Sequence, residues 1–142
     1  MHFQRIKDTR IDNDFTQVEM AKILNCPQST YNRYENGKVE FPANVVIKIS
    51  EVLNVSCDYL LGMSNVKGVF YGVQCSIAQR LYIARRNAYM TQEQIASILI
   101  CPREVYIRYE SGKRTCPLEM ITTLAKYYKV SCDYLLGLNV IS

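Results

Sequence analysis

The amino-acid sequence contains one long internal repeat. Moving residues 3–64 along the chain by 75 positions places them on residues 78–139 without a gap, and 25 of the 62 aligned residues are identical. The best-matched piece, VSCDYLLG, occurs at residues 55–62 and again at residues 130–137. Solenoids are built from three or more shorter repeats. A single ungapped duplication of this length therefore predicts two domains with the same fold.

The repeat sets the expected domain borders. Domains at residues 1–64 and 77–142 leave residues 65–76 as a linker. Gly68 and Gly72 interrupt any helix in this linker, while its valine, phenylalanine and tyrosine side chains make it too apolar for a fully solvated tether. We expect part of it to pack on a domain or to form the contact between the domains.

Each half of the repeat has the pattern of five helices. Thr16 followed by Glu19, and Thr91 followed by Gln94, are typical of a capping box at the start of a second helix. Pro27 suits the start of a third helix, where its missing N–H costs nothing. Apolar residues recur at helical spacing, and no segment has the pattern of a strand. The predicted fold class is all-α.

Charge is divided unevenly between the halves. Residues 1–64 hold seven Lys and Arg against eight Asp and Glu, a net charge of −1, whereas residues 77–142 hold nine against five, a net charge of +4. Opposite charge raises the local concentration of a ligand. A polyanion is therefore expected to be drawn mainly to the second half.

The sequence argues against several other classes of protein. The N-terminal MHFQRIKDTR is too charged for a signal peptide, and no apolar run approaches the ~20 residues of a membrane span, so we expect a soluble, cytoplasmic protein. Six cysteines without a C-x-x-C pair, and the single His2, favour reduced thiols and no metal site. Without an internal histidine, a carboxylate paired with a nucleophile or a Gly-rich phosphate loop, no enzyme, cofactor or small-molecule substrate is expected.

One combination of residues resembles a known family. The pattern TQ…A…L…STY..YENGK…P…VS.DYLLG of the first half, with its counterpart in the second, resembles the Cro/repressor-type helix-turn-helix domain (XRE family, lambda-repressor-like fold). The resemblance covers about 62 residues in each half. It implies two tandem five-helix helix-turn-helix domains of a bacterial or phage transcription regulator that binds double-stranded operator DNA.

The resemblance also implies which residues contact DNA. Gln17 and Gln92 begin the second helices, where family members hold a phosphate and brace the recognition helix. Lys38 and Lys113 follow the recognition helices, close to phosphate. The outward positions of the recognition helices are Gln28, Ser29, Asn32 and Arg33 in the first half, and Arg103, Glu104, Ile107 and Arg108 in the second.

The same resemblance implies a structural role for two charged pairs. Arg10 with Glu35, and Arg85 with Glu110, occupy positions that form a salt bridge between the first and third helices in many members. Since Arg85 is then occupied, we favour Arg86 as a DNA contact over a merely solvated face. Most of the tyrosines on amphipathic helices are expected in the core or half-buried, as aromatic residues usually are.

Base-recognition chemistry differs between the two recognition helices. Gln and Asn can each bond an adenine edge twice, and Arg does the same for guanine, so the first helix has a mixed reading set and the second a guanine-leaning one. Glu104 could accept a hydrogen bond from a cytosine amino group. Ile107 could touch a thymine methyl group, or it could face a partner protein.

Two functions are consistent with these patterns. In the first, both recognition helices read the major groove, and the chain is a covalent pseudo-dimer that acts most simply as a repressor. In the second, the more acidic first domain is a protein-interaction or dimerisation module, and only the second binds DNA. RNA binding is a weaker alternative, because the exposed stacking aromatics that it usually needs are missing.

Overall fold

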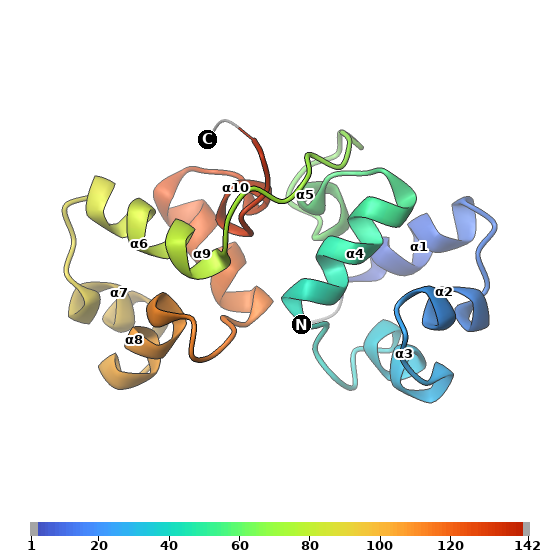
Figure 1. Ribbon diagram of the computed structural model, residues 1–142, viewed down its shortest axis with the longest axis horizontal. Helices are drawn as coiled ribbons and strands as arrows, with labels where there is room; N and C mark the ends of the chain where they lie inside the picture. The colour runs from blue at the N-terminus through green and yellow to red at the C-terminus, as the bar shows by residue number, and fades with distance from the viewer. Residues whose placement is uncertain (1–2, 141–142) are drawn as a thin grey trace. The chain divides into compact units, whose positions relative to one another are not determined.

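The structure, a computed structural model, describes residues 3–140 and divides between Phe70 and Tyr71 into two compact units (Figure 1). The first unit contains α1 (Gln4–Asp12), α2 (Gln17–Ile23), α3 (Gln28–Glu35), α4 (Ala43–Leu53) and α5 (Cys57–Leu60). The second contains α6 (Ile77–Asn87), α7 (Gln92–Leu99), α8 (Arg103–Ser111), α9 (Leu118–Tyr128) and α10 (Cys132–Leu135). Within residues 3–140 no strand forms, and an isolated antiparallel bridge joins Val73 to Leu138. The predicted all-α class is confirmed.

The predicted helix starts are confirmed by their hydrogen bonds. In α2 the Thr16 hydroxyl accepts from the Glu19 N–H at 3.1 Å, and the Glu19 carboxylate accepts from the Thr16 N–H at 3.0 Å. Thr91 and Gln94 form the same capping box at α7. Pro27 lies at the N-cap of α3, where its extended backbone (φ −62°, ψ 146°) leads into the first turn. These local signals place α2 and α3 one after the other across a short turn.

Each unit packs its helices around equivalent apolar side chains. In the first unit α2 packs on α3, α1 packs on α3 and α5, and α4 packs on α5; in the second, α8 packs on both α6 and α7. Fully buried residues recur at matching places, with Met20, Tyr31, Ile49 and Leu60 in one unit and Ile95, Tyr106, Leu124 and Leu135 in the other. The tyrosines predicted for the core or its edge, Tyr31, Tyr34, Tyr59, Tyr106, Tyr109 and Tyr134, are all buried or half-buried.

The expected linker is shared between the two units. On the first unit, the Lys67 carbonyl accepts from the Ser56 N–H at 2.7 Å, and the Asn54 side chain accepts from the Phe70 N–H at 3.1 Å. On the second, the Gly137 carbonyl accepts from the N–H groups of residues 74 and 75, and the Gly72 carbonyl accepts from the Asn139 N–H. Most of residues 65–76 is therefore hydrogen-bonded to one unit or the other.

An arginine clamp ties the first and last helices of each unit together. Arg80 on α6 donates to the Tyr134 carbonyl at 2.5 Å and to the Leu138 carbonyl at 3.0 Å, and its guanidinium lies 4.3 Å from the centre of the Tyr134 ring. Arg5 on α1 makes the equivalent contacts with Tyr59 and the segment after α5. Arg80 is buried, so these bonds satisfy a charge that water does not reach.

The six cysteines are buried or half-buried thiols. None of the six forms a disulfide; Cys57, Cys116 and Cys132 are buried and the other three are half-buried. Among residues 3–140 no group of three or more His, Cys, Asp or Glu side chains is placed to hold a metal, and His2 lies outside the described residues. No helix in that range combines the length and apolar character needed to cross a membrane.

Gly137 is expected to tolerate substitution far less well than its counterpart Gly62. Both have positive φ, +88° and +75°, so alanine at either is expected to cost about 1 kcal/mol. At Gly137 an added Cβ would also overlap the Cys75 backbone, whereas nothing lies within 4 Å at Gly62. We expect Gly137→Ala to destabilise the second unit by roughly 2–4 kcal/mol, measured by urea titration of unit-specific NMR signals. Equal effects of the two variants would contradict the close approach of the linker.

Candidate nucleic-acid interface

A chain of side-chain hydrogen bonds braces α3, the expected recognition helix of the first unit. Arg10 on α1 donates to both oxygens of Glu35 at 2.6 and 3.0 Å, and to the Phe15 carbonyl at 2.6 Å. Gln17 at the start of α2 donates to Glu35 at 3.1 Å and accepts from Asn32 at 3.1 Å. This bracing chain (Arg10, Glu35, Gln17 and Asn32) confirms the expected salt bridge and joins three helices.

The electrostatics of the bracing chain keep both partners charged. Burial alone would raise the pKa of Glu35, but the hydrogen bonds that Glu35 accepts, above all from Arg10, more than offset it, and the pKa is lowered. The hydrogen bond to Glu35 raises the pKa of Arg10. The pair is therefore ionised although the Glu35 side chain is completely buried and that of Arg10 is only 8% exposed. A bidentate pair of this kind fixes orientation as well as distance.

The predicted DNA contacts of the first unit fall into two groups. Gln28, Ser29, Arg33 and Lys38 are exposed on or just after α3. Gln17 and Asn32 are half-buried, and Asn32 also accepts from the Asn36 side chain at 2.9 Å. The sequence pattern placed Gln28 and Asn32 on one face of α3, whereas the structure engages Asn32 with α2. Its amide keeps one donor and one lone pair for another partner.

The second unit has the same salt bridge and an incomplete bracing chain. Arg85 on α6 donates to both oxygens of Glu110 at 2.8 and 2.9 Å, and to the Met90 carbonyl at 2.8 Å, which confirms the expected pair. Its pKa is raised, chiefly by the hydrogen bonds to Glu110. At the position of Asn32 stands Ile107, which has no polar group to offer Gln92. Residue 107 of α8 therefore donates no side-chain hydrogen bond to Gln92, unlike Asn32 to Gln17 in the first unit.

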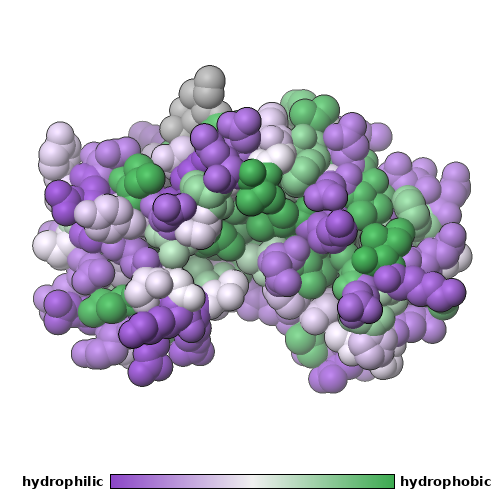
Figure 2. All heavy atoms as spheres, in the orientation of Figure 1, coloured by the Kyte–Doolittle hydropathy of each residue, from purple (hydrophilic) through white to green (hydrophobic). Residues whose placement is uncertain are grey.

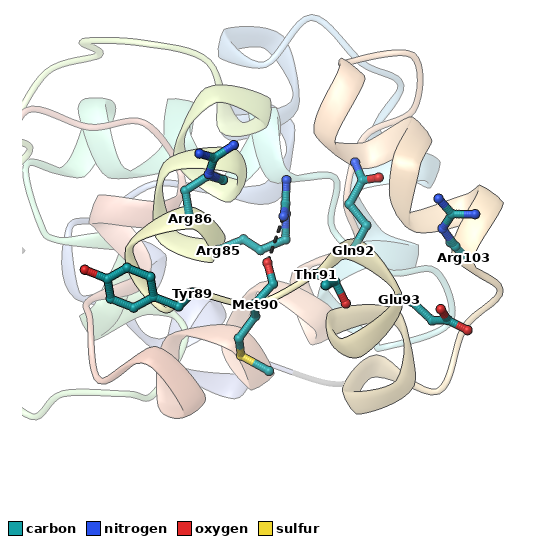
Figure 3. Close-up of a pocket in the computed structure, with 8 residues that line it drawn as sticks. All are labelled: Arg85, Arg86, Tyr89, Met90, Thr91, Gln92, Glu93 and Arg103. Carbon is teal, nitrogen blue, oxygen red and sulfur yellow. Dashed lines mark hydrogen bonds between the residues drawn. The ribbon is translucent and has the colours of Figure 1, made fainter.

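A surface pocket with a volume of about 780 Å³ lies where α6 ends and α7 and α8 begin. Figure 3 shows the Gln92 side chain between those of Arg85 and Arg103, and a dashed line marks the bond from Arg85 to the Met90 carbonyl. Arg86 and Tyr89 complete one rim and Glu93 the other. The N-terminus of α7 contributes free N–H groups and partial positive charge to this surface, which suits an anion.

The outward residues of α8 are available to contact a partner molecule. Arg103, Glu104 and Arg108 are exposed, Ile107 is half-buried, and Lys113 is exposed just beyond the helix end. Tyr106 and Tyr109 on the opposite side are buried in the core. The helix is thus divided between a face that packs and a face that does not. Arg86, on α6, is exposed and donates to the Tyr82 hydroxyl at 3.2 Å.

The matching surface of the first unit has a different chemistry. Its counterparts of Arg86, Glu93 and Arg103 are Ile11, Val18 and Gln28, and Ile11 and Val18 are 50% and 46% exposed. In Figure 2 the visible face over α7 and α8 is mainly hydrophilic, while hydrophobic side chains break the face over the helices of the first unit. Two arginines of one unit are therefore replaced by an apolar and a neutral residue in the other.

Sequence reasoning missed the polar contacts that cross between helices. The clamps of Arg5 and Arg80 were not anticipated, although both arginines are retained in the repeat. Retention at matching positions of the two halves was the signal that could have found them. The engagement of Asn32 with Gln17 left no such signal, because the second half has Ile107 instead.

Comparison with known proteins agrees with this geometry. A family model described as "Helix-turn-helix" matches residues 6–60, and another described as "Helix-turn-helix domain" matches residues 78–139. The uncharacterized HTH-type transcriptional regulator YqaE of Bacillus subtilis is 32% identical over 117 residues, which cover 80% of this chain and all of the relative. The chain belongs to the helix-turn-helix family of transcriptional regulators.

Other helix-turn-helix relatives match this chain over about the length of one of its domains. The HTH-type transcriptional regulator ImmR of Bacillus subtilis is 35% identical over 63 residues, 44% of this chain and 50% of the relative. The SPbeta prophage-derived uncharacterized regulator YonR of the same organism is 36% identical over 61 residues, 43% of this chain and 56% of the relative. The chain thus matches about half the length of these two relatives. No solved structure matches it significantly.

Proposed function

We propose that this helix-turn-helix protein is a sequence-specific regulator that binds double-stranded DNA through α3 and α8 in the major groove. The observation that carries the proposal is the division of α8 into a buried tyrosine face and an outward face bearing Arg103, Glu104 and Arg108. An α-helix fits the major groove, and arginine can pair twice with a guanine edge. The outward residues of α3, Gln28 and Arg33, supply the same kind of contact with a different base preference.

Phosphate contacts are assigned to residues at or beside the helix ends. In the second unit these are Gln92, Arg86 and Lys113, and in the first Gln17 and Lys38. Phosphate contacts fix the position of a protein on the duplex, whereas base contacts read the sequence. The buried pairs of Arg10 with Glu35 and Arg85 with Glu110 support both functions, because they fix the recognition helix against the first helix of its unit.

Two different recognition helices in one chain favour an asymmetric operator. Tethering raises the effective concentration of the second head once the first is bound. The simplest consequence is repression by occupation of an operator. A regulator of this kind in a bacterium, such as the organism of its relatives, works in the cytoplasm, where the DNA lies.

A second candidate function assigns the first unit to a protein contact. Its support is the exposure of Ile11 and Val18 where the second unit has Arg86 and Glu93, together with the net charge of −1 over residues 1–64. Exposed apolar side chains near a recognition helix suit a partner protein or a second copy of the chain better than phosphate. In this case only α8 reads DNA.

Selection of bound sequences from a random duplex pool tests the proposal. We expect a motif with two unlike half-sites and a footprint longer than one head protects. Affinity for the selected site is expected to fall steeply with salt, since each neutralised phosphate releases counterions. A motif with one half-site would favour the second candidate. The absence of any enriched motif, with a flat salt dependence, would rule out DNA as the ligand.

A further inference from the structure

A second cavity, of about 310 Å³, lies in the second unit between α6 and α9, away from the outward face of α8. Its walls include Ala84 and Ala88 on one side and Tyr127, Tyr128 and Tyr134 on the other. Met90 forms part of the rim, where its sulfur accepts from the Tyr127 hydroxyl at 3.3 Å. The Tyr127 and Tyr128 rings meet edge to face at 5.6 Å. This volume is at the lower end of the range of small-molecule sites.

The first unit has larger side chains at the places of the two alanines. The counterparts of Ala84 and Ala88 are Thr9 and Asn13. Thr9 is buried and its hydroxyl donates to the Arg5 carbonyl at 2.6 Å, while the Asn13 amide donates to the Thr9 carbonyl at 2.8 Å. One wall of the cavity therefore has two residues smaller than their counterparts, while the other wall has Tyr127 and Tyr128 where the first unit has Val52 and Leu53.

The lining defines the chemistry of an occupant. None of the cavity's lining residues carries a charge. Aromatic rings, the Met90 thioether, the side chains of Val130 and the two alanines, and the neutral Asn87 amide line the space. Aromatic pairs prefer edge-to-face or offset contacts. A small planar molecule without charge satisfies this lining, whereas an ion would lose hydration without gaining a partner.

Met90 connects the cavity to the pair that positions α8, because it lines the cavity and its carbonyl accepts a hydrogen bond from Arg85 at 2.8 Å. The Tyr128 hydroxyl oxygen, on the cavity wall, is buried and has no hydrogen-bond partner among residues 3–140. Burial raises the pKa of Tyr128, and the nearby charge of Glu110 raises it further while that of Arg85 lowers it. The Tyr128 ring forms part of the cavity wall. A buried polar group without a partner is costly, so a small shift of this ring is sensitive to what fills the cavity.

We propose that this cavity is a binding site for a small uncharged aromatic molecule, and that Met90, whose carbonyl accepts from Arg85, carries its occupancy to the Arg85–Glu110 pair that holds α8. The binding step does not depend on the proposed function. The consequence for α8 offers a route by which an effector regulates the recognition helix, since Glu110 belongs to α8 itself.

Titration of the full chain with indole, followed by amide NMR shifts, tests the site. We expect saturable shifts at Ala84, Ala88 and Val130, and smaller ones at Arg85 and Glu110. Signals of the first unit serve as an internal control and should stay in place. Benzoate, an anion of similar size, is expected to bind at least about tenfold more weakly because no cation lines the cavity.

Refilling the cavity with the residues of the first unit is the matched variant. The substitutions Ala84→Thr and Ala88→Asn are expected to weaken indole binding at least about tenfold, since they occupy the space that the ligand needs. Ala88 is exposed, so Ala88→Asn alone keeps the test available if the double variant fails to fold. Shifts that do not saturate, or affinity unchanged in the refilled variants, would overturn the site. Binding without shifts at Arg85 and Glu110 would overturn the link to α8.

Discussion

Replacing Arg10 with alanine is expected to destabilise the first unit by about 3–5 kcal/mol, because it leaves a buried charge without its partner. The Glu35 side chain is completely buried and accepts both of its short hydrogen bonds from Arg10. Gln17 still donates to Glu35 in the variant, but a neutral amide offsets only part of the lost interaction. Since the Glu35 carboxylate must stay ionised or take up a proton, the loss is expected to be smaller at acid pH.

The control for this prediction is the exposed pair of Lys48 and Glu51. Their charged atoms are 3.3 Å apart and their side chains are 48% and 50% exposed. Lys48→Ala is expected to change stability by no more than about 1 kcal/mol, as for other surface pairs. Urea unfolding monitored on NMR signals of the first unit measures both variants in the full chain. Similar losses for Arg10→Ala and Lys48→Ala would show that burial does not make the inner pair important.

Arg108→Ala is expected to weaken binding to the selected DNA site by about 1–3 kcal/mol, the usual value of a bidentate base contact. Arg108 is exposed on α8, whereas the adjacent Tyr109 is buried, so the substitution removes a reading group without disturbing the core. Its matched variant in the first unit is Arg33→Ala. Fluorescence anisotropy with the selected duplex, together with footprint length, measures both.

The two variants separate the candidate functions. If both heads read DNA, each variant loses affinity and relaxes the preference at its own half-site. If the first unit is a protein-interaction module, Arg33→Ala leaves affinity and footprint length unchanged while Arg108→Ala keeps its effect. Unchanged affinity for Arg108→Ala would contradict the assignment of α8 as a recognition helix in either case.

Features written in short stretches of sequence could be predicted. The capping boxes at Thr16 and Thr91 depend on residues three positions apart, so the sequence is sufficient to find them. The Arg10–Glu35 and Arg85–Glu110 pairs came from the family resemblance, because their partners are 25 positions apart and no local pattern joins them. The assignments of individual residues to DNA remain predictions.

Features that depend on packing between distant segments could not be predicted. The hydrogen bond between Asn32 and Gln17 joins residues 15 positions apart. The hydrogen bonds from the linker to the Gly137 carbonyl join residues more than 60 positions apart. Both require the helices to be in place first. The cavity beside Tyr128 has the same origin, since its walls come from α6, α9 and α10.

The sequence by itself determined the duplication, the helical class and the helix starts, and through the family resemblance it indicated α3 and α8 as the expected recognition helices. Periodicity and capping are local chemistry, and the repeat shows them twice. Only the tertiary structure decided which side chains remain available: it engages Asn32 with α2, leaves Arg108 exposed, and opens a cavity in one copy where the other has Thr9 and Asn13. Exposure and free volume depend on which residues from other segments lie beside a side chain, and that information exists only once the chain has folded.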